Sequence, residues 1–184
     1  DHPQVARLGE ALARSGFAAL LYWSPAMRDL RLDPEDTDNI ALACDQLLRH
    51  PATDARRSGL LGTCVGGSFA LLAAAHPLIR DRISFVSAFA PYGSMSTLAV
   101  AIASGTQAAT TGREDWSVDP LTRAVYVRSL TATLEPDEAE RVRNGVADDL
   151  SRDARLILPL LDPLQPDDAE AALQRLPPAM QERL

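Results

Sequence analysis

Residues 59–75 constrain the fold more than any other stretch of this sequence. A short apolar run ends just before Gly-Thr-Cys-Val-Gly-Gly, and a run of small, apolar residues follows it. This pattern predicts a buried strand, a sharp turn and a buried helix. Glycines stand on both sides of Cys64, at Gly62, Gly66 and Gly67. A turn this sharp strains its central residue and crowds the positions two before and two after it, which favours glycine there.

A turn of this kind would push the Cys64 side chain out above the sheet. The N-terminal end of a helix favours the thiolate, and the thiolate is the nucleophilic form of cysteine. We therefore predict that Cys64 is a catalytic nucleophile and that the backbone N–H of Val65 contributes to an oxyanion hole. The alternative is that the glycines only permit close packing and that Cys64 is a small buried hydrophobe.

The order of the predicted elements indicates an α/β fold for the first half of the chain. Residues 3–90 alternate helical and strand patterns. Residues 17–23 form a continuous apolar run, which is typical of a parallel strand covered on both faces, and 57–61 and 83–90 are predicted as two further strands. Such alternation with short links predicts a parallel sheet with right-handed crossovers.

The pattern changes after Gly93, where no further strand-like run follows. A polar loop is expected over 105–117. Five helices are predicted, each opened by acidic residues or proline or by an apolar helical pattern: 95–103, 119–130, 135–144, 150–161 and 166–176. We interpret this block as a helical cap over the active-site end of the sheet; the alternative is a separate helical bundle.

The Gly-x-Cys-x-Gly turn at Cys64 and the order of elements resemble the dienelactone hydrolase branch of the α/β-hydrolase superfamily. In that branch the corresponding turn, called the nucleophile elbow, carries a cysteine followed by Gly-Gly. The likeness covers residues 1–93 well and the remainder only loosely. It implies that 1–93 is the central part of a three-layer parallel sheet, with three strands, and that 94–184 is an all-helical cap or lid. It also implies hydrolysis of a small-molecule ester, lactone or thioester through an acyl-enzyme on Cys64, with no metal and no cofactor.

The family's cysteine works with an Asp and then a His, and neither partner is found here. The sequence has three histidines. His50 and His76 each precede a proline at the tail of a helix, so we expect both to be surface residues at the edge opposite the catalytic strand ends. His2 opens the first helix. We therefore expect the triad acid and base beyond Leu184, which would make this chain an inactive internal segment of a larger enzyme.

A different class of function remains open. Under this hypothesis the chain is a degenerate, non-catalytic α/β-hydrolase domain that binds a ligand or a partner. Cys64 would then be an evolutionary remnant without a catalytic role. A dinucleotide-binding sheet is disfavoured because no Gly-x-Gly-x-x-Gly follows a predicted strand.

Composition excludes several other functions. The net charge of −7 argues against a nucleic-acid partner, and the absence of lysine excludes P-loop and Schiff-base chemistry. No apolar run reaches the length of a membrane span. The two cysteines, Cys44 and Cys64, do not make a disulfide framework. Cys44 is predicted to be a buried residue that packs in the core. A cytoplasmic location is favoured.

Overall fold

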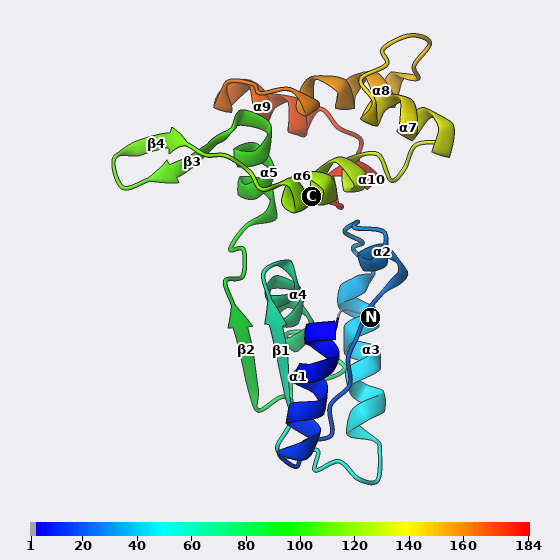
Figure 1. Ribbon diagram of the computed structural model, residues 1–184, viewed down its shortest axis with the longest axis vertical. Helices are drawn as coiled ribbons and strands as arrows, with labels where there is room; N and C mark the ends of the chain where they lie inside the picture. The colour runs from blue at the N-terminus through cyan, green and yellow to red at the C-terminus, as the bar shows by residue number, and fades with distance from the viewer. Residues whose placement is uncertain (1–2) are drawn as a thin grey trace. The chain divides into compact units, whose positions relative to one another are not determined.

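The computed structural model describes residues 3–184 and divides into two compact units (Figure 1). Unit 1 holds residues 3–24 together with Glu35–Gly93, and unit 2 holds Pro25–Pro34 together with Ser94–Leu184. The sequence predicts a loop after Ser24. In the structure, this segment contains the short helix α2 (Pro25–Arg28) and belongs to unit 2.

Unit 1 is built from three helices and a parallel strand pair. Its elements are α1 (Pro3–Arg14), α3 (Asp36–Leu48), β1 (Gly59–Thr63), α4 (Val65–Ala74) and β2 (Phe85–Phe89). The two strands pair in parallel, from Gly59 opposite Phe85 to Thr63 opposite Phe89. The crossover from β1 through α4 to β2 is the βαβ unit that the sequence predicts.

One face of this strand pair is covered by helices and the other is not. Helix α4 packs on both strands and α3 packs on α4, and Leu60 of β1 lies against a small buried cluster. The cluster consists of Ala41, Cys44, Leu48 and Ile79. Because side chains alternate along a strand, Leu61, Phe85 and Phe89 share the opposite face, where they are 54%, 51% and 75% exposed.

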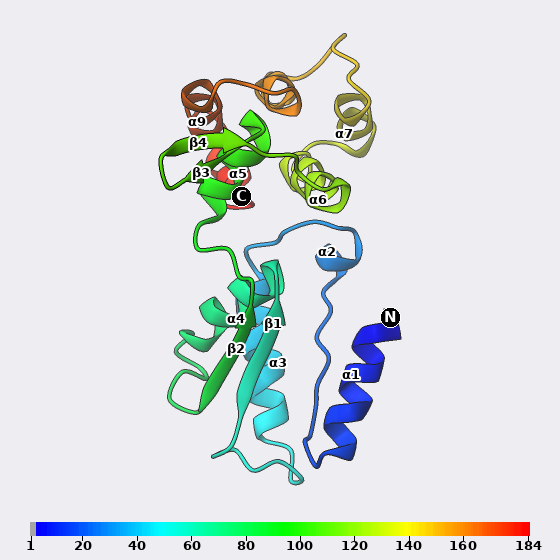
Figure 2. The same ribbon diagram turned by 60° about the vertical axis from the view of Figure 1, so that its left-hand side comes forward.

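The predicted strand over 17–23 does not form. Among the described residues, β1 pairs only with β2, and residues 17–23 run as irregular chain between α1 and α2 (Figure 2). Phe17 and Trp23 are 53% and 41% exposed. An apolar sequence is not sufficient for a strand, because a strand needs a neighbouring backbone to satisfy its N–H and C=O groups. The sheet of unit 1 therefore has two strands in place of the predicted three.

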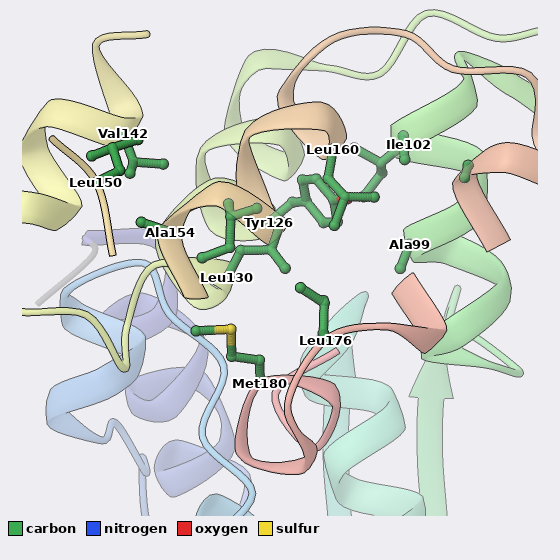
Figure 3. Packing of buried hydrophobic residues seen from close by; sticks show 13 residues of the cluster. Ala99, Ile102, Tyr126, Leu130, Val142, Leu150, Ala154, Leu160, Leu176 and Met180 are labelled. Atoms are coloured by element: carbon green, nitrogen blue, oxygen red, sulfur yellow. The ribbon is translucent and has the colours of Figure 1, made fainter. Parts of the chain in front are cut away.

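Unit 2 has the larger core, and it is mainly helical. Its further elements are α5 (Met95–Ser104), β3 (Thr106–Ala109), β4 (Gly112–Asp115), α6 (Pro120–Leu130), α7 (Pro136–Arg143), α8 (Arg152–Ile157), the 3-10 helix η1 (Leu158–Leu161), α9 (Pro166–Gln174) and α10 (Pro178–Gln181). Figure 3 shows side chains from these helices converging on one apolar cluster. Leu130, Ile157 and Leu160 in this cluster have no exposed surface.

Helix starts in unit 2 follow local sequence signals. The Asp119 carboxylate accepts hydrogen bonds from the N–H groups of Leu121 and Thr122, each at 3.0 Å, and Pro120 occupies the first turn. The predicted single helix over 150–161 is instead α8 followed by η1. The change falls next to Pro159, which lacks the N–H that a continuing α-helix would use.

The predicted polar loop over 105–117 is instead an antiparallel hairpin of β3 and β4. Ala109 lies opposite Gly112, so two residues form the turn. Polar side chains connect the strands: Gln107 Nε2 donates to Glu114 Oε1 at 2.7 Å, and Arg113 Nε donates to Thr106 Oγ1 at 2.9 Å. The sequence lacks apolar alternation here because the hairpin is held by exposed polar pairs across the strands.

Candidate active site

The turn between β1 and α4 holds Cys64 in an unusual backbone conformation. Cys64 is the N-cap of α4 and has φ 55° and ψ −130°, a region that residues other than glycine rarely adopt. Its N–H donates to the Phe89 carbonyl at 2.8 Å, and its carbonyl accepts from the Gly67 N–H at 2.9 Å. The predicted strand-to-helix turn with an outlying central residue is confirmed, whereas the role of Cys64 as a nucleophile stays a prediction.

The glycines around Cys64 differ in how strictly the turn requires them. A Cβ on Gly62 would lie 2.2 Å from the carbonyl oxygen of Gly66, so no side chain fits there. A Cβ on Gly67 would lie 3.3 Å from the carbonyl oxygen of Gly62 and from Pro91 Cβ, which is tight. A Cβ on Gly66 would meet nothing within 4 Å. The expected crowding is therefore correct for Gly62 and wrong for Gly66, whose missing side chain would point into open space.

The Cys64 side chain is exposed and has a phenol beside it. Its Sγ lies 3.5 Å from Oη of Tyr92. Val65 is the first residue of α4, so its N–H belongs to the helix end where the amides have no acceptor within the helix. Thiol, amide and phenol thus gather where the chain leaves β1 and β2.

Tyr92 was not identified as a site residue from the sequence. It comes three residues after the end of β2, and the carboxyl ends of paired parallel strands meet at one edge of a sheet. A polar side chain at this position, directly after the neighbouring strand, is the signal that would have indicated it.

The two described histidines make local contacts at helix ends. His50 Nδ1 accepts from the Ala52 N–H at 3.2 Å. His76 Nδ1 accepts from the Leu78 N–H at 3.1 Å, and its Nε2 lies 3.5 Å from Asp38 Oδ1. Each histidine thus binds the backbone of the turn that follows its helix; His50 is exposed and His76 is half-buried. His2 lies outside the described residues.

Neither described histidine is placed to serve as a base for Cys64. His76 follows the C-terminal end of α4, and the ten residues of that helix rise about 15 Å from the turn that holds Cys64. Helix α3, which His50 follows, runs away from the strand ends (Figure 1).

Cys44 provides a contrast within the same unit. It is buried in the cluster beneath the sheet, and burial raises the pKa of its thiol. Both cysteines are free thiols. The prediction that Cys44 is buried packing is confirmed.

The described residues contain no group of three or more His, Cys, Asp or Glu side chains that could hold a metal ion. The buried carboxylate of Asp36 has local partners: it accepts from Tyr22 Oη at 3.0 Å and from Ser24 Oγ at 2.9 Å. No helix within residues 3–184 is long and apolar enough to cross a membrane.

Comparison with known proteins gives one partial likeness. The chain is 37% identical over 89 residues to a protein of Bradyrhizobium sp named "Probable 2-oxo-3-(5-oxofuran-2-ylidene)propanoate lactonase". The match covers 40% of this chain and 36% of that protein, so the chain spans only about a third of the relative's length. A lactonase is a hydrolase, which fits the hydrolase part of the resemblance; the dienelactone hydrolase branch stays a prediction.

No protein-family model matches the chain, and no solved structure matches it.

Proposed function

We propose that this chain carries the nucleophile of a Cys-dependent α/β hydrolase that opens a lactone or cleaves a related ester or thioester. The observation that carries the proposal is the backbone of Cys64, held at φ 55° between a parallel strand and a helix N-terminus with its thiol exposed. Strain of this kind is typical of functional positions. The name of the partial relative favours a lactone over other acyl substrates.

In the proposed reaction the Cys64 thiolate attacks the lactone carbonyl carbon. A bond forms between Sγ and that carbon, and the carbonyl electron pair moves to oxygen. The Val65 N–H and the positive end of α4 stabilise this oxyanion. When the tetrahedral intermediate collapses, the bond to the ring oxygen breaks, and the ring oxygen takes up a proton. The product is an acyl-enzyme thioester with a free hydroxyl on the acyl chain.

Water then hydrolyses the thioester and returns Cys64 to its thiol form. Both steps need a group that carries protons. Neither His50 nor His76 lies at this edge of the sheet, and no histidine follows His76 in the sequence. We propose that the acid and base lie outside this sequence, in an order of nucleophile, acid and base.

The test compares variants at the two cysteines, in the full-length protein that contains this chain. Cys64→Ala should lower hydrolysis of a p-nitrophenyl ester and of a simple lactone by several orders of magnitude, as expected when a nucleophile is removed. Cys64→Ser should retain partial activity, because a hydroxyl would face the same amide donors. The matched control, Cys44→Ala, removes a thiol that is buried away from the turn and should keep the activity.

Detection of the acyl-enzyme distinguishes the proposed hydrolase from a non-catalytic binding domain. Arg49 and Arg57 lie between the two cysteines, so trypsin places the cysteines on different peptides. An acyl adduct on the Cys64 peptide during turnover supports the proposal. Undiminished activity of Cys64→Ala would overturn it. Ligand binding without acylation or turnover would favour the non-catalytic domain.

A further inference from the structure

A side chain from the loop that follows β2 lies beside the Cys64 thiol. Tyr92 is half-buried, and its Oη lies 3.5 Å from Cys64 Sγ. The loop reaches this position through Ala90, whose φ is 48°. Each strand of the pair is thus followed directly by a residue other than glycine with positive φ, Cys64 after β1 and Ala90 after β2. The hydrogen bond from the Cys64 N–H to the Phe89 carbonyl joins the two strand ends.

Ser68, in the first turns of α4, forms hydrogen bonds with the backbone of Tyr92. Ser68 Oγ donates to the Tyr92 carbonyl at 3.0 Å and accepts from the Tyr92 N–H at 2.9 Å. Ser68 stands four residues after Cys64, so the two side chains lie one helical turn apart. The position of the phenol relative to the thiol is therefore set by two hydrogen bonds within the same turn–helix unit.

The segments that form β1, α4 and β2 carry no charged side chain. Residues 58–75 and 83–93 contain no Asp, Glu, Arg or His, and Cys64 and Tyr92 are their only titratable side chains. Helix α3, packed against α4, carries three carboxylates. Asp36 is bound by Tyr22 and Ser24, Asp38 lies beside His76, and Asp45 is bound by Arg49 and Arg82.

We propose that Tyr92 is a positioning residue that donates a hydrogen bond to the Cys64 thiolate and that Ser68 holds it in place. In the thiol form Sγ donates to Oη. Once the proton leaves, sulfur can only accept, so the hydroxyl of Tyr92 turns to donate to it. A hydrogen bond to an ionised acceptor is stronger than one to a neutral acceptor. The phenol therefore favours the thiolate and holds the sulfur above the turn.

This inference rests on the proposed function, which makes the Cys64 thiolate the nucleophile. The test of the hydrogen bond itself does not depend on turnover. The test measures the rate of iodoacetamide alkylation of Cys64 against pH, read on its tryptic peptide in the chain of residues 1–184. In Tyr92→Phe, the pH of half-maximal alkylation should rise by roughly half a unit to one unit. Ser68→Ala should shift it in the same direction by less. The matched control is Tyr126→Phe, because Tyr126 lies in the core of unit 2.

A profile for Tyr92→Phe that coincides with the unsubstituted chain would overturn the inference. If Tyr92→Phe does not fold, as judged by circular dichroism, the decision passes to Ser68→Ala, for which an unchanged profile has the same meaning. A shifted profile together with full activity of Cys64→Ala would support the thiol–phenol pair while rejecting the proposed function. The two proposals can therefore fail separately.

Discussion

The two units use their apolar residues in opposite ways. Unit 2 buries them in one continuous cluster, in which Leu130, Ile157 and Leu160 are fully covered. Unit 1 leaves many of its large apolar side chains exposed to solvent. Those exposed in unit 1 are Leu8, Phe17, Leu20, Leu21, Trp23, Leu42, Leu61, Leu71, Leu72, Phe85 and Phe89, whereas unit 2 exposes Leu121 and Val146.

This contrast separates stability from candidate function. The packed cluster of unit 2 holds most of the buried apolar residues, and burial of apolar surface is the main source of stabilising free energy. The strained turn, the exposed thiol and the phenol all lie in unit 1. Backbone hydrogen bonds and close glycine contacts hold the site in unit 1. The sheet of unit 1 has helices on only one described face.

The largest expected difference between the units concerns core substitutions. Leu160→Ala in unit 2 should lower the free energy of unfolding by about 2–5 kcal/mol, because it leaves a cavity among fully buried side chains. Leu72→Ala in α4, where the side chain is 58% exposed, should change it by less than about 0.5 kcal/mol. Urea unfolding followed by circular dichroism measures both. Equal losses would mean that Leu72 is covered in solution and that the contrast between the units is wrong.

The next effect tests how far unit 1 depends on its glycines. Gly62→Ala should destabilise unit 1 by about 1–3 kcal/mol or more, because the new Cβ would collide with the backbone of Gly66. Gly66→Ala has open space and a helical position, so it should stabilise α4 by about 0.5–1 kcal/mol. Opposite signs in the two unfolding curves are expected. A harmless Gly62→Ala would contradict the close approach at the turn.

A smaller effect is expected at a helix start in unit 2. Asp119→Ala removes the acceptor for two N–H groups of α6 and should cost about 1 kcal/mol. Asp119→Asn keeps an oxygen acceptor and should cost much less. Thermal unfolding of the two variants provides the comparison. If the alanine and asparagine variants melt together, the cap does not contribute as the geometry indicates.

The smallest effect is a pH dependence in unit 1. A hydrogen bond from Arg82 holds the pKa of the Asp45 carboxyl below its ordinary value, and Arg49 adds to this. The folded state therefore binds this proton less readily than the unfolded state. The resulting stability is present above about pH 4 and is lost as the pH falls through the lowered pKa.

Asp45→Asn should remove this contribution. The variant should be less stable than the unsubstituted chain at pH 7, and the gap should narrow between about pH 4 and pH 2. Urea midpoints measured across this range provide the test. A gap of constant size at all pH values would show that the ion pair with Arg82 does not contribute through the charge of Asp45.

Local sequence was sufficient for those elements whose signals lie within a few residues of one another. The glycines and apolar runs around Cys64 predict its turn, and Asp119 with Pro120 predicts the exact start of α6. Caps, steric crowding and helical periodicity act between near neighbours, so they can be read along the chain.

Other features depended on partners that are distant in the sequence. The apolar run 17–23 formed no strand because no described backbone pairs with it, and residues 106–115 formed a hairpin through polar pairs across its strands. Tyr92 reaches Cys64 only because β1 and β2 are paired in register and Ser68 fastens the loop that follows. Hydrogen-bonded ladders and contacts between separate segments are set by which segments meet, and only the tertiary structure decides that.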